Sequence, residues 1–84
     1  MKTLDKIILD FRDERKKEQH DIEVSSDITA RELILGLIEA YGLDIDTSYP
    51  DNIFLRANNP TVLLKGDKKL YEYGLHQGSI VYYL

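Results

Sequence analysis

The sequence predicts an α+β fold in which one helix packs on one face of a single mixed β-sheet. Several short segments alternate apolar and polar residues with the period of two that is typical of strands, and one segment has the three- and four-residue spacing of a helix. The last apolar segment is predicted to run parallel to the first strand, after a crossover through the helix. The length of 84 residues indicates a single domain, residues 1–84, with one core.

The first two strands are expected close to the N-terminus. Residues 6–12 alternate apolar and polar side chains, and residues 20–24 do so again. The polar segment 13–19 between them lacks the Asn-Gly or Asp-Gly pair of a tight turn. We therefore expect a hairpin whose loop is several residues long and mobile at its tip.

An amphipathic helix is predicted over residues 30–41. Thr29 followed by Glu32 matches a capping box, in which each side chain accepts a hydrogen bond from the backbone N–H of the other residue. Gly42 supplies the left-handed residue that ends the helix. Gly36 costs about 1 kcal/mol relative to alanine within a helix, which indicates either close packing against the sheet or simple tolerance.

Three more strands are predicted after the helix, over residues 52–57, 61–65 and 79–84. The sequence Asn-Asn-Pro at 58–60 ends the first of them, and residues 70–75 form either a helical turn or a packed loop. The order is β-β-α-β-β-β. With the first and last strands parallel and adjacent, this order defines a β-grasp fold.

Composition argues against several classes of function. The absence of cysteine excludes disulfides, thiolate zinc sites and iron–sulfur clusters, and the net charge of −4 disfavours nucleic acid. There is no signal peptide and no apolar run long enough to span a membrane, so a cytoplasmic location without membrane insertion is expected. His20 at the start of a predicted strand and His76 in a turn are isolated, and both are predicted to be solvent-exposed rather than to form a site. The aspartates of residues 44–51 lack the glycine and glutamate of a calcium loop. No catalytic residue, metal or cofactor is predicted.

Residues 6–12, 29–42 and 70–84 together resemble ubiquitin-like proteins. In particular, the segment Leu-Tyr-Glu-Tyr-Gly-Leu at 70–75 is similar to the loop that precedes the last strand of ubiquitin. The chain resembles more specifically the YukD and EsaB proteins of type VII secretion systems in Gram-positive bacteria, which share its short length and its hydrophobic final strand. This resemblance implies protein partners among the membrane components or the motor ATPase of such a system, and recruitment to the inner face of the cell membrane.

A single helix covers one face of the sheet and leaves the other face open. The strand residues predicted to face the helix are Ile7, Leu9, Phe11, Ile22, Val24, Ile53, Leu55, Leu64, Leu75, Val81 and Tyr83. The residues predicted to point away and to bind proteins are Ile8, Phe54, Arg56, Ile80 and Tyr82. Aromatic, aliphatic and arginine side chains together are typical of interface centres. A one-residue slip in register would turn Phe54 and Tyr82 inward, and ordinary scattered surface residues are a second alternative.

The predicted function is therefore that of an unconjugated, non-catalytic ubiquitin-like adaptor or regulator of type VII secretion. Two alternatives stay open. A covalent modifier or sulfur carrier needs a flexible C-terminal Gly-Gly, whereas this sequence stops at Leu84 within a predicted strand. The cytosolic N-terminal domain of a larger membrane secretion protein would be followed by transmembrane segments. The oligomeric state is not predicted.

Overall fold

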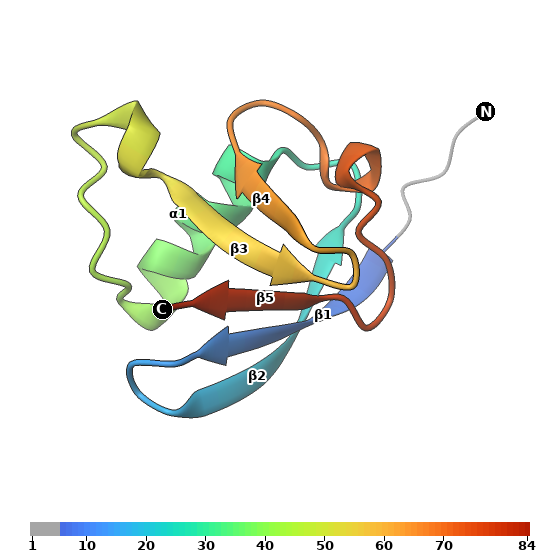
Figure 1. Cartoon of the computed structure of the whole chain (residues 1–84), viewed down its shortest axis with the longest axis horizontal. Coiled ribbons are helices and arrows are strands. Elements are labelled where there is room, and N and C mark those ends of the chain that lie inside the picture. Colours follow the sequence, from blue (N-terminus) through green and yellow to red (C-terminus); the bar gives the residue numbers. More distant parts are fainter. Residues whose placement is uncertain (1–5) are drawn as a thin grey trace.

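The computed structural model describes residues 6–84, which form one sheet, one α-helix and two short 3₁₀ helices (Figure 1). The prediction that the chain does not start with a signal peptide rests partly on residues 1–5, which lie outside the described residues. The strands are β1 (Lys6–Asp13), β2 (Glu18–Ser25), β3 (Phe54–Asn58), β4 (Val62–Lys65) and β5 (Ile80–Tyr83). The helices are α1 (Ala30–Tyr41), η1 (Pro50–Asn52) and η2 (Leu70–Tyr73).

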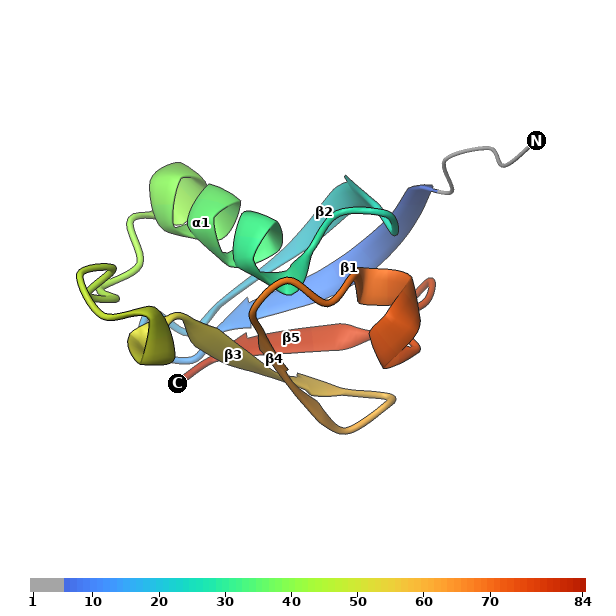
Figure 2. The same cartoon turned by 90° about the horizontal axis from the view of Figure 1, so that it is seen from above.

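The sheet has the strand order β2-β1-β5-β3-β4. β1 runs antiparallel to β2 and parallel to β5, while β3 runs antiparallel to both β5 and β4. α1 crosses one face of the sheet and leaves the opposite face open, as the two views show (Figures 1 and 2). The predicted α+β, β-grasp fold with its parallel pair of first and last strands is confirmed.

The hairpin of β1 and β2 has a turn of several residues, as predicted. Asp13 pairs with Glu18, so that residues 14–17 form the turn and both strands extend further into the polar segment than predicted. Asp13 is buried, and its Oδ1 accepts hydrogen bonds from the backbone N–H groups of Arg15 (3.0 Å) and Lys16 (3.1 Å). This carboxylate stabilises the turn locally, a role that does not require an Asn-Gly or Asp-Gly pair.

The predicted start and end of α1 are confirmed. The backbone N–H of Glu32 donates to Thr29 Oγ1 (3.1 Å), and the N–H of Thr29 donates to Glu32 Oε1 (2.8 Å), which completes the capping box. Gly42 ends the helix with a φ of 66°, a left-handed conformation that glycine adopts readily. Gly36 is exposed, and a Cβ built on it would meet no atom within 4 Å. Gly36 is therefore not required for close packing against the sheet, and the helix simply tolerates a glycine at this position.

The core lies between α1 and the covered sheet face, and the predicted inward side chains occupy it. Ile22 and Val24 on the edge strand β2 are partly buried and pack against the core, and the others are buried. The segment with two predicted alternatives forms the 3₁₀ helix η2, from which Leu70 enters the core. The hydroxyl of Tyr73 donates a 2.6 Å hydrogen bond to the carbonyl of Lys65, joining η2 to β4.

Candidate protein-binding surface

The open sheet face carries one row of four side chains that runs across four strands. Arg12 pairs with Tyr82, Tyr82 with Arg56, and Arg56 with Leu63. The residues before and after each of them along its strand are buried or partly buried against α1. Because side chains alternate across a strand, these four residues point away from the helix.

The two arginines of this row differ in their surroundings. Arg12 donates to Asp10 Oδ2 through Nη2 (2.9 Å) and Nε (3.2 Å), and Gln19 donates to the same oxygen (3.2 Å). The hydrogen bond with Asp10 and the charge of that carboxylate raise the pKa of Arg12. Asp10 Oδ1 is buried without a hydrogen-bond partner among the described residues. Arg56, by contrast, is exposed and forms no hydrogen bond or ion pair within residues 6–84.

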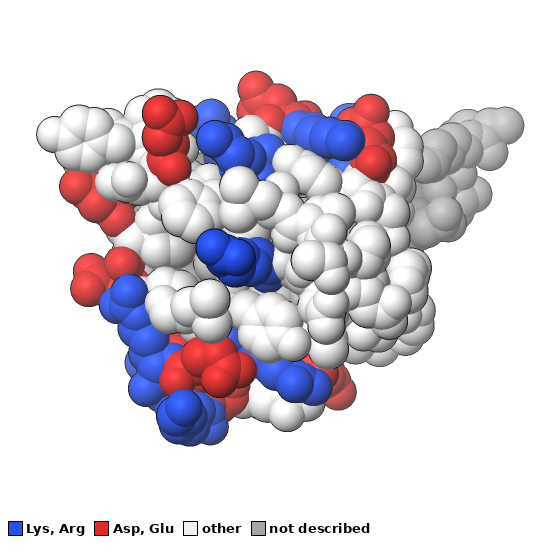
Figure 3. Space-filling view, viewed as in Figure 1, with Lys and Arg blue, Asp and Glu red and all other residues white. Residues whose placement is uncertain are grey.

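Two hollows flank Arg56 and Tyr82. The first, of about 400 Å³, lies towards the end of β5 and includes Phe54 in its lining. The second, of about 390 Å³, lies over β3 and β4 and includes Leu63. Arg56 and Tyr82 line both hollows and so stand between them. In the space-filling view, a basic side chain stands among uncharged ones over the middle of this face, and most other charges lie towards its margin (Figure 3).

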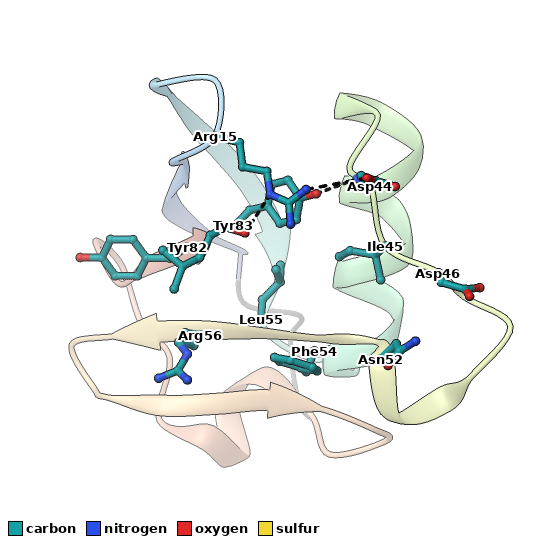
Figure 4. A pocket seen from close by; sticks show the side chains of 11 residues that line it. Arg15, Asp44, Ile45, Asp46, Asn52, Phe54, Leu55, Arg56, Tyr82 and Tyr83 are labelled. Carbon is teal, nitrogen blue, oxygen red and sulfur yellow. Dashed lines mark hydrogen bonds and ion pairs between the residues drawn. The ribbon is translucent and has the colours of Figure 1, made fainter.

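The side of the first hollow formed by Arg15, Asp44 and Tyr83 brings together three parts of the chain, which contact one another (Figure 4). The guanidinium carbon of Arg15 lies 4.7 Å from the ring centroid of Tyr83, and Arg15 Nε donates to the carbonyl of Leu84 (3.0 Å). Arg15 also forms an exposed ion pair of 3.8 Å with Asp44. The guanidinium of Arg15 thereby covers one face of the Tyr83 ring, and the charge of Arg15 is offset by Asp44.

The structure places the five sequence-predicted binding residues on the open face but not in one compact group. Phe54, Arg56 and Tyr82 line the first hollow together. Ile80 lies next to them on β5, paired with Asp10 and two residues before Tyr82. Ile8 is 41% exposed, but it lies beyond Asp10 on β1, at the end of the sheet away from Phe54.

Leu63 belongs to the same surface and was not among the predicted residues. It is 47% exposed and pairs with Arg56. The alternation of its strand could have revealed it, because Leu64 was assigned to the core and its neighbour must then point outward. The alternation of residues 6–12 also puts Arg12 on the outer face, on the same side as Asp10 two residues before it.

The two histidines do not form a site. His20 lies within β2, as its place in a predicted strand implies, but it is half-buried rather than exposed because its ring stacks on Tyr41 with centroids 4.6 Å apart. His76 is exposed in the turn before β5. Across residues 6–84, no three His, Asp or Glu side chains come together in a group that could hold a metal ion. None of the helices in this part of the chain has the length and apolar character needed to cross a membrane.

The fold and the open face define the chain as a ubiquitin-like domain. Solved structures with this fold include the UBL domain of yeast Ddi1, with a TM-score of 0.63, 22% sequence identity, and coverage of 90% of this chain and 86% of that one. Another is the UBL domain of Plasmodium falciparum Dsk2, with a TM-score of 0.60, 20% identity, and coverage of 92% and 96%. No curated protein matches the chain.

The family described as "WXG100 protein secretion system (Wss), protein YukD" matches residues 10–82, and the chain belongs to this family. The predicted resemblance is thus confirmed. Family and fold together support a non-catalytic, ubiquitin-like protein that takes part in WXG100 protein secretion.

Proposed function

We propose that this protein is an adaptor or regulator of the WXG100 secretion system that binds other proteins through its open sheet face. The contact residues would be Phe54, Arg56, Ile80 and Tyr82, with Ile8 at the far end of the same face. The observation that carries the proposal is the exposed group of aromatic, aliphatic and arginine side chains between two hollows. The site of action would be the cytoplasm, at the inner face of the cell membrane.

The composition of this surface supports a protein partner. Phe54 is 41% exposed and Leu63 is 47% exposed, although both lie in strands whose inward residues form the core. Exposed apolar groups of this kind mark interaction sites, and tyrosine, phenylalanine and arginine are enriched where interfaces are most tightly packed. The family context favours partners within the WXG100 secretion system, and we take its membrane components or its motor ATPase as the candidates.

The test replaces Phe54→Asp and Tyr82→Asp in a bacterium that carries the system, with Leu35→Asp as the matched control. Leu35 is 40% exposed, almost the same fraction as Phe54, but it lies on α1 and therefore on the other side of the molecule. The measurements are export of WXG100 proteins into the medium and site-specific crosslinking to the membrane components and the motor ATPase. Circular dichroism of each purified variant shows whether it folds.

Both open-face variants should fold and should reduce crosslinking and export by at least about tenfold, because a buried charge replaces an interface anchor. Leu35→Asp should leave both measurements close to those of the unchanged protein. Normal export and crosslinking by folded Phe54→Asp and Tyr82→Asp variants would show that the open face is not the binding surface.

A further inference from the structure

We propose that Arg56 anchors one carboxylate of the protein partner. Apolar side chains of the same partner segment, one on each side of its acidic residue, would enter the two hollows. This inference rests on the proposed function and adds the chemistry of the partner to it. Arg56 is exposed, forms no ion pair within residues 6–84, and lies between the two hollows.

Arg56 is unpaired in a chain that has more acidic than basic residues. The sequence holds 15 acidic and 11 basic residues, and within residues 6–84 five lysine and arginine side chains form ion pairs with aspartates. The strand neighbours of Arg56 are Phe54 and Asn58 along β3 and Tyr82 and Leu63 across it, none of which is acidic. The five N–H donors of the guanidinium are therefore left to solvent or to a partner.

A partner that covers this surface must satisfy Arg56. Burial of an unpaired guanidinium is strongly unfavourable, so an entirely apolar partner would lose much of what it gains from contact with Phe54 and Leu63. A carboxylate is the group whose two oxygens match the planar fork of arginine in a bidentate pair.

The surrounding charges favour a carboxylate over a phosphate group. A phosphate carries close to two negative charges and is commonly held by a cluster of cations. Here the charges of the other two nearby arginines are already offset, Arg12 by Asp10 and Arg15 by Asp44. Among the three arginines Arg12, Arg15 and Arg56, Arg56 alone forms no ion pair within residues 6–84, and one such cation fits a single negative charge.

The hollows define what lies beside the acidic residue of the partner. Ile45, Phe54 and Leu55 contribute to the lining of the first hollow, and Val62 and Leu63 to that of the second. Because residues two apart in an extended chain point to the same side, an acidic residue between two apolar ones at that spacing could reach Arg56 and both hollows. The partner segment is therefore expected to be extended, with an apolar residue two positions before and two positions after its acidic residue.

The test is an NMR titration of the ¹⁵N-labelled chain with synthetic nonapeptides. Each has leucine two positions before and two positions after its central residue, serine and glycine elsewhere, and blocked ends. The central residue is glutamate, glutamine, lysine or phosphoserine. The glutamate peptide should shift the Arg56 Nε–H signal and the Tyr82 amide signal in a saturable way. The glutamine and lysine peptides should bind at least about tenfold more weakly.

Two variants separate a specific contact from general attraction. Arg56→Gln should lose the preference for glutamate, and Arg56→Glu should reverse it in favour of lysine. The control is Arg31→Gln, which removes the same charge from α1, where Arg31 forms an exposed 3.6 Å ion pair with Asp67. The control should bind the glutamate peptide like the unchanged protein.

Three results would overturn the carboxylate anchor. They are equal binding of the glutamate and glutamine peptides, tighter binding of the phosphoserine peptide, and no saturable shift at Arg56 at millimolar peptide. Export measured in the bacterium then separates this inference from the proposed function. If Phe54→Asp abolishes export and Arg56→Gln does not, the open face is the binding surface but Arg56 does not anchor a carboxylate. Normal export with both variants rejects the face itself.

Discussion

The hydroxyl of Tyr83 accepts a 2.8 Å hydrogen bond from the backbone N–H of Asp44, which joins the last strand to the segment that follows α1. Tyr83 is 6% exposed, so water does not readily take its place. The same ring lies under Arg15, and all three residues line the first hollow. This hydrogen bond therefore contributes both to stability and to the shape of the proposed binding surface.

Removing that hydroxyl with Tyr83→Phe should lower the free energy of unfolding by about 1 kcal/mol, because the Asp44 N–H loses its acceptor in a partly buried position. Urea unfolding measures the change. Tyr82→Phe is the matched control, since the hydroxyl of Tyr82 has no partner among residues 6–84 and its loss should cost less than about 0.5 kcal/mol. Equal losses in the two variants would contradict the role of the hydrogen bond.

Neighbouring residues on β1 should respond very differently to truncation. Leu9 is fully buried between the sheet and α1, and Leu9→Ala should destabilise the protein by about 3 kcal/mol through lost burial and a cavity. Ile8 is 41% exposed on the opposite face, and Ile8→Ala should stay within about 0.5 kcal/mol. Thermal and urea unfolding of both variants check this. Similar losses at the two positions would mean that β1 does not alternate between core and solvent as described.

The fold could be predicted because its local signals agree with one another. The capping box of Thr29 and Glu32 and the cap at Gly42 set the limits of α1. Alternation set the face of each strand, and Val81 is buried while Tyr82 points outward, as expected for the last strand. Both kinds of signal depend on residues close together in the sequence, which is why spacing alone was sufficient.

The feature that could not be predicted is the lack of a partner for Arg56. Asp10 lies two residues before Arg12 on β1, so alternation alone puts this pair on one face. The neighbours of Arg56 across the sheet are Tyr82 and Leu63, neither of which is acidic, and they become neighbours only through the strand order. The outward face of Arg56 followed from the sequence, whereas its lack of a partner required the structure.

The carboxylate of Asp46 provides a prediction about pH. It accepts a 2.9 Å hydrogen bond from the backbone N–H of Ser48, and this bond together with one from the Ser48 side chain lowers the pKa of Asp46 below its ordinary value of 3.8. Because the folded protein binds this proton less tightly, ionised Asp46 stabilises the fold above pH 3.8, and the contribution is lost as pH falls through the lower folded-state pKa.

By NMR, the carboxyl carbon of Asp46 should titrate with a midpoint below pH 3.8. Ser48→Ala removes the hydroxyl but keeps the backbone N–H, so it should raise the midpoint part of the way towards the ordinary value. A midpoint at or above pH 3.8 in the unchanged protein would contradict the assigned hydrogen bonds.

The glycine in the middle of α1 and the glycine that ends it should respond to alanine with opposite signs. Gly36 is exposed within the helix and a Cβ there meets no atom within 4 Å, so Gly36→Ala should raise the free energy of unfolding by about 1 kcal/mol. Gly42 also has space for a Cβ, but its φ of 66° is strained for alanine, so Gly42→Ala should lower it by about 1 kcal/mol. Urea unfolding measures both changes. Since neither site lacks room, effects of the same sign would show that backbone conformation is not what distinguishes them.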